Sequence, residues 1–234
     1  MTIKGTDAND MLTGSLSAET LYGLDGNDVI RAGGGHDTVW GGNGNDGLNG
    51  EAGNDIINGG TGDDDLYGGA GNDFIDDYSG YNYLNGGAGD DTLLGRGEFN
   101  GGKGNDYIGN VKDGSGGDII HFNLGDGKDT IDSWDWYNEQ DKIIFGADVT
   151  ADMISFRREE NALVVVVGDQ GDEMNFLFFF WQRGYYGTAN QTYTRFEFAD
   201  GTVWEDIRQT SQFAAGSTMV RVGTALFGAR DYSL

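Results

Sequence analysis

Single aliphatic residues recur every nine positions along the first part of the chain, and the positions between them are mostly polar or glycine. Each aliphatic residue sits at the centre of a three-residue stretch, which predicts a short strand with one side chain pointing inward. The six residues before each stretch are rich in glycine, which predicts a tight turn. The recurring aliphatic positions are Leu12, Leu21, Ile30, Val39, Leu48, Ile57, Leu66, Ile75, Leu84 and Leu93.

An acidic or amide residue occupies the sixth position of every nonapeptide. Two nonapeptides make one turn of a flattened parallel roll, so alternate acidic residues stack in two rows. Row A comprises Asp10, Asp28, Asp46, Asp64 and Asn82, and row B comprises Glu19, Asp37, Asp55, Asp73, Asp91 and Asp106. Row B reaches Asp106 because GRGEFN (95–100) is a unit that lacks three loop residues, after which GGKGNDYIG (101–109) restores the motif.

This nonapeptide, GGxGxDxUx, resembles the glycine-rich repeat of RTX proteins, which binds Ca²⁺. The resemblance implies an all-β fold, a right-handed parallel β-roll followed by a β-rich C-terminal capping module. It also implies that calcium is bound between successive turns of the roll.

The chemistry of the loops points to the same ion. Stacked carboxylates repel one another, and a hard divalent cation that takes six to eight oxygen ligands relieves this repulsion. Adjacent pairs in the two rows give about eight Ca²⁺ ions. Asn82 brings an oxygen without a charge, which predicts a weakened step beside Asp64. The predicted metal ligands are Asp10, Asp28, Asp37, Asp46, Asp55, Asp64, Asp73, Asn82, Asp91, Asp106, Gly26, Gly35, Gly44, Gly53, Gly62, Gly71, Gly89 and Gly104.

The charge of the chain favours cations as partners. Asp and Glu number 39 against 14 Lys and Arg, giving a formal net charge of −25. Such a charge disfavours nucleic acids and anionic membranes. The chain has no Cys, which excludes disulfides and Cys-ligated zinc, and no apolar run long enough to span a bilayer.

The residues after the repeats change character. Gly125, Asp126, Gly127 and Asp129 fit either one further calcium loop or an ordinary hairpin turn. Strand-like stretches follow, and FEFADGTVW (196–204) resembles the haemolysin-type calcium-binding-related module. FLFFFW (176–181) is expected to be a buried strand. We therefore expect a β-roll over 1–121, a capping module over 122–207 and a tail over 208–234.

The expected function is that of a secreted, non-catalytic calcium-binding protein that folds on Ca²⁺ after type I export. The N-terminus has no apolar signal segment, and Asp231-Tyr232-Ser233-Leu234 resembles the end of an uncleaved type I secretion signal. Catalysis is not expected, since neither H-E-x-x-H nor G-x-S-x-G occurs. The partners expected are calcium ions and the type I secretion machinery, with the protein extracellular, monomeric and away from membranes. The alternatives are a C-terminal calcium-binding domain of a larger exported enzyme, toxin or adhesin, and a pore-forming protein.

Overall fold

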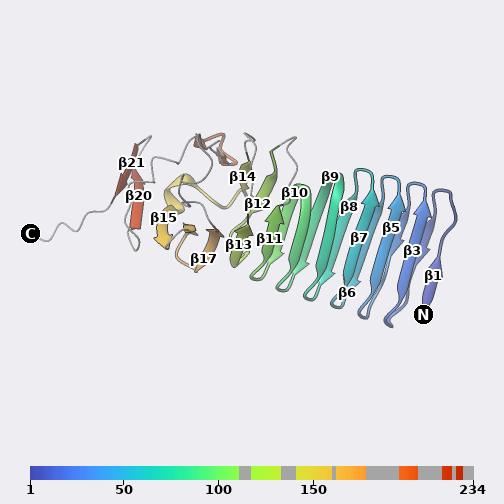
Figure 1. The fold of residues 1–234 in the computed structure, drawn as a ribbon. Helices are drawn as coiled ribbons and strands as arrows, with labels where there is room; N and C mark the ends of the chain where they lie inside the picture. The colour runs from blue at the N-terminus through green and yellow to red at the C-terminus, as the bar shows by residue number, and fades with distance from the viewer. Residues whose placement is uncertain are drawn as a thin grey trace, which may run out of the picture.

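The first half of the chain winds into a parallel β-solenoid whose short strands stack like the rungs of a ladder (Figure 1). The computed structural model describes residues 1–110, 117–132, 141–159, 162–177, 195–204, 218–222 and 225–228. Strand β1 lies at one end of the solenoid, and β20 and β21 lie beyond the other end. The predicted all-β roll is confirmed.

Two stacks of strands form the two walls of the solenoid. The first stack contains, in order, β1 (Thr2–Lys4), β3 (Thr20–Asp25), β5 (Thr38–Asn43), β7 (Ile56–Thr61), the start of β9 (Phe74–Ala88), the start of β10 (Thr92–Lys103), β11 (Tyr107–Asn110), β13 (Lys128–Asp132) and β17 (Asp172–Phe176). The second contains β2 (Met11–Thr13), β4 (Val29–Arg31), β6 (Gly47–Ala52), β8 (Asp65–Ala70), the ends of β9 and β10, β12 (Ile119–Phe122), β14 (Lys142–Phe145) and β18 (Arg195–Glu197). All these pairings are parallel.

The register between turns is set by twice the sequence repeat. Leu21 pairs with Val39, and Val39 pairs with Ile57, each 18 residues further along the chain. One aliphatic side chain from each half-turn points inward, and these side chains are fully buried from Leu21 to Leu93. Because burying one such side chain is worth about 1.5–3 kcal/mol, this double row is the core of the solenoid.

Glycines shape the turns between the two walls. Gly53 has a φ of 143°, a backbone conformation that other residues rarely adopt. A Cβ at this position would also collide with the main-chain oxygen of Gly35, one turn earlier. Successive loops can therefore approach this closely only because neither carries a side chain there.

The C-terminal part closes the solenoid with antiparallel strands. β15 (Ile154–Glu159) follows the 3₁₀ turn Ala151–Met153 and pairs with β16 (Ala162–Val167), which pairs with β17. β18 pairs with β19 (Val203–Trp204). β20 (Thr218–Val222) pairs with β15 on one side and with β21 (Ala225–Gly228) on the other. The aromatic rings of Phe145, Phe156, Phe196, Phe198 and Trp204 pack together beneath these strands.

The parallel stacking does not stop at residue 121. β13, β14, β17 and β18 continue the two walls, so the pairing shows no break at this expected boundary, and the three-part division stays a prediction. Phe176 is buried at the end of β17, whereas the rest of FLFFFW from residue 178 lies outside the described residues. The Asp231–Leu234 ending also lies outside them. Within the described chain, no helix has the length and apolarity to cross a membrane.

Candidate metal centre

Rows A and B exist as two hydrogen-bonded ladders along the solenoid. In each step, the Oδ1 atom of one residue accepts a hydrogen bond from the main-chain N–H of the row member one turn earlier. The Asp28 N–H donates to Asp46 at 2.7 Å, and the Asp64 N–H donates to Asn82 at 2.9 Å. In row B the Asp55 N–H donates to Asp73 at 2.8 Å. The parity argument from the sequence is therefore correct about which residues stack.

The second carboxylate oxygen is unpaired at eight of the predicted sixth-position ligands. These Oδ2 atoms are buried and have no hydrogen-bond donor among the described residues. They belong to Asp28, Asp37, Asp46, Asp55, Asp64, Asp73, Asp91 and Asp106. An acceptor-only oxygen buried without a donor is costly, so its environment calls for a positive charge.

A second acceptor meets several of these oxygens at the first residue of the repeat. A Cβ on Gly41 would lie closer than 3.0 Å to both Asp46 Oδ2 and the main-chain oxygen of Gly59. Gly68 is placed in the same way against Asp73 Oδ2 and the Gly86 oxygen. The pocket between two turns is thus lined by oxygens and kept open by glycine, which fits Ca²⁺.

Most of the oxygens must come from the main chain. Among the described residues, no three acidic or histidine side chains converge on one point. The predicted glycines Gly26, Gly35, Gly44, Gly53, Gly62, Gly71, Gly89 and Gly104 all have positive φ. From Gly44 onward, each of them places its Cα against the main-chain oxygen of a glycine one turn earlier. Their carbonyls are therefore stacked along the loops, and their role as calcium ligands stays a prediction.

Burial makes the ionised carboxylates unstable without a cation. Burial raises the pKa of Asp46 to about 6 and that of Asp91 to about 7, although each accepts a backbone hydrogen bond that opposes the shift. The neighbouring acids in the row raise these pKa values further. A bound divalent ion would reverse this penalty by compensating the charge.

The first member of each row differs from the rest. Asp10 is not fully buried, and its Oδ2 accepts hydrogen bonds from the N–H and the hydroxyl of Thr6, at 2.6 and 2.8 Å. Glu19 accepts from the N–H of Ser15 at 2.9 Å and from its hydroxyl at 2.5 Å. Local donors therefore already satisfy these two carboxylates.

The loop around Asp129 stacks as one further turn of row B. The Asp106 N–H donates to Asp129 Oδ1 at 3.0 Å, and Gly125 and Gly127 have positive φ. Burial raises the pKa of Asp129 to about 8. β12 and β13, the strands on either side of this loop, each pair in parallel with other strands and not with each other, so the segment is not a hairpin. Calcium binding by this loop stays a prediction.

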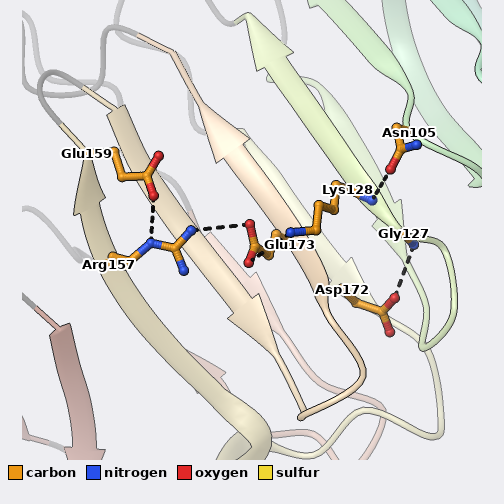
Figure 2. A network of polar contacts seen from close by, with 7 residues as sticks. All are labelled: Asn105, Gly127, Lys128, Arg157, Glu159, Asp172 and Glu173. Carbon is orange, nitrogen blue, oxygen red and sulfur yellow. Dashed lines mark hydrogen bonds and ion pairs between the residues drawn. The ribbon is translucent and has the colours of Figure 1, made fainter. Parts of the chain in front are cut away.

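Asp172 closes row B from the capping strands. Its carboxylate accepts from the N–H of Gly125 at 2.8 Å and from that of Gly127 at 3.2 Å. Beside it, Glu173 of β17 forms ion pairs with Lys128 of β13 and Arg157 of β15 (Figure 2). These ion pairs connect the strand after the last loop to the capping strands. Met174 follows at the register position of Asp129, and the row of carboxylates ends there.

Sequence reasoning missed several members of the rows. Asp118 and Asp141 extend row A, since Gly97 donates to Asp118 at 2.8 Å and Asp118 donates to Asp141 at 3.1 Å. Asp77 is also buried beside row A. The nine-residue period could not place them in the rows, because the spacing lengthens to 21 residues before Asp118 and to 23 residues after it, and because Asp77 occupies a glycine position.

These features define a class of protein, a parallel β-solenoid whose stacked loops present rows of aspartates and glycine carbonyls. The four-copy model of the RTX calcium-binding nonapeptide repeat matches this chain over residues 13–48, 40–75 and 67–108. The resemblance read from the sequence is confirmed, and with it calcium as the ion of this repeat.

One solved structure illustrates the comparison with known folds. The extracellular lipase LipA from Serratia marcescens is similar to this chain at 19% sequence identity with a TM-score of 0.36. The similarity covers 76% of this chain and 38% of the lipase chain, so this chain spans well under half the length of that lipase. A comparison with curated protein sequences finds no significant match.

Proposed function

We propose that this chain is a secreted, non-catalytic calcium-binding module that folds when Ca²⁺ fills rows A and B. The observation that carries the proposal is the set of eight buried aspartate oxygens that have no hydrogen-bond donor within the described part of the chain. One ion for each unpaired oxygen gives about eight ions, since Ca²⁺ needs several oxygens and each half-turn offers only one such carboxylate atom.

Calcium suits these pockets better than magnesium does. Ca²⁺ accepts six to eight oxygens in flexible geometry, whereas Mg²⁺ demands a near-ideal octahedron and keeps its waters. The pockets are made of main-chain carbonyls held by a repeating register, which cannot easily contract around a smaller ion. Selectivity for calcium should therefore be strong.

Export before folding is consistent with the charge of the chain. At −25, the metal-free chain resists compaction, and a low calcium concentration inside the cell leaves weak sites empty. Outside the cell, the free energy of calcium binding becomes free energy of folding. We propose a type I exporter that recognises the C-terminal tail.

The decisive experiment measures bound calcium and β-structure together. The chain is stripped of metal on a chelating resin and titrated with Ca²⁺ or Mg²⁺, while circular dichroism follows folding and atomic emission counts bound ions. We expect cooperative gain of β-structure with about eight Ca²⁺ ions and little gain with Mg²⁺. Equal β-structure in metal-free and calcium-saturated chains would refute the proposal.

A further inference from the structure

Asp77 breaks the pattern of the solenoid at the first position of its repeat, where most other units carry glycine. Its side chain is 1% exposed, as are those of Asp64 and Asn82. In the turns before it, the first residue contributes a main-chain oxygen to the pocket of the row A carboxylate one turn earlier. A carboxylate at this position therefore changes the chemistry of one pocket only.

The Asp77 carboxylate lies close to the unpaired oxygen of Asp64. A Cβ on Gly59 would lie closer than 3.0 Å to Oδ2 of both Asp64 and Asp77. Asp77 Oδ2 accepts a hydrogen bond from the Gly60 N–H at 3.0 Å, and Asp77 Oδ1 accepts from the Ser79 N–H at 3.0 Å. These two amides fix the orientation of the carboxylate.

No positive side chain compensates this pair. Among the described residues, neither Asp64 nor Asp77 forms a salt bridge. Asp63 and Asp76, the charged neighbours, are also acidic. Two buried carboxylates that face each other under these conditions need a cation between them or a shared proton.

Asn82 carries an amide where the other members of row A carry a carboxylate. Its Oδ1 accepts from the Asp64 N–H at 2.9 Å, as an aspartate would. Its Nδ2 donates to the main-chain oxygens of Asp77 at 3.4 Å and Ser79 at 3.2 Å. The amide thus supplies, within its own loop, positive hydrogen atoms in place of an ion.

We propose that Asp77 is a calcium ligand and that Asp77 and Asn82 exchange roles within their repeat. The ion held by Asp64 receives a second carboxylate from Asp77, while the Asn82 amide leaves the loop of residues 77–82 without an ion of its own. This inference rests on the proposed calcium binding by rows A and B. From the sequence we expect a weakened calcium site beside Asp64, because Asn82 lacks a charge. In this proposal the same site is the most negative pocket of row A.

The test compares four chains by calorimetric Ca²⁺ titration and by counting bound ions. Asp77→Asn removes the charge and keeps the shape, and Asp65→Asn removes the same charge from an exposed position nearby. The double variant Asp77→Gly with Asn82→Asp restores the arrangement of the other repeats. We expect Asp77→Asn to lose one ion or about tenfold in affinity at one site. Asp65→Asn should match the unaltered chain, and the double variant should regain the lost site.

The outcomes separate this inference from the function on which it rests. If the unaltered chain binds no calcium, the proposed function fails. If it binds calcium and Asp77→Asn binds the same number of ions with the same affinities, only the role of Asp77 is refuted. Unchanged calcium binding with greater stability in metal-free buffer would identify a shared proton and also refute it. If Asp77→Asn does not fold at saturating calcium, the double variant Asp77→Gly with Asn82→Asp provides the test. Loss of a calcium site in this double variant would contradict the proposed exchange of roles between Asp77 and Asn82.

Discussion

Removing calcium should reverse the pH dependence of folding. In the metal-free roll, burial raises the pKa of Asp46, Asp73 and Asp106 to about 6 and that of Asp91 to about 7, from 3.8 in the unfolded chain. The folded state then binds protons more tightly than the unfolded state. Metal-free stability should therefore rise as the pH falls from about 8 towards about 5.

The size of the effect follows from these shifts. One pKa unit corresponds to about 1.4 kcal/mol, so a single carboxylate shifted from 3.8 to about 6 destabilises the metal-free fold by roughly 3 kcal/mol at neutral pH. Four such groups cost on the order of 10 kcal/mol, which rivals the ~5–15 kcal/mol stability of an ordinary domain. The metal-free roll should accordingly be unfolded at neutral pH and regain β-structure in mild acid.

The calcium-loaded chain should behave in the opposite way. Protons compete with Ca²⁺ for the same carboxylates, so acid should release the ions and lower stability. The assay is circular dichroism and urea unfolding from about pH 8 to about pH 5, in resin-treated buffers with and without added Ca²⁺. Chelators are avoided during the scan because their own affinity falls with pH. Metal-free β-structure that increases with pH would refute the reasoning.

Three further predictions concern single parts of the molecule. Asp55→Asn should weaken calcium binding about tenfold or more, because Asp55 contacts the turns on both sides, and titration against the exposed Asp65→Asn checks this. Gly53→Ala should destabilise the calcium-loaded roll by roughly 2 kcal/mol or more in urea unfolding, whereas Gly47→Ala, whose added Cβ would meet only the main-chain oxygen of Asp28 at 4.0 Å, should change little. Truncation after Ala214 should abolish export through a type I system and remove the pairing of β20 with β15, while the purified protein should still gain the β-structure of the roll with Ca²⁺. Normal secretion of the truncated chain would contradict the proposed secretion signal. Failure of the truncated chain to fold would show that the tail belongs to the cap.

The sequence was sufficient to predict the solenoid and its two rows for a physical reason. Each turn contacts the next at a constant separation of 18 residues, so a local period dictates the register, as between Leu48 and Leu66. The acidic row members and the inward aliphatic residues occupy fixed positions in that period. Their stacking therefore follows from counting residues.

The rest depends on contacts without a period. Asp172 reaches Gly125 across 47 residues, and no spacing in the chain indicates this contact. Asp141 joins row A only after an irregular segment, and Asp77 takes part from a position that normally has no side chain. Such features depend on where a carboxylate points, which the pattern of residue types does not specify.

The register of 18 residues also constrains how such a gene can grow or shrink. Insertion of two nonapeptides adds one complete turn and leaves every later strand on its own wall, so the inward side chains and both rows stay aligned. Insertion of one nonapeptide would also keep the 18-residue stacking, but it would move all later repeats, and the strands that follow them, to the opposite wall. Since β13 and β17 continue one wall and β14 and β18 continue the other, variants that keep these C-terminal strands in place should differ by even numbers of repeats.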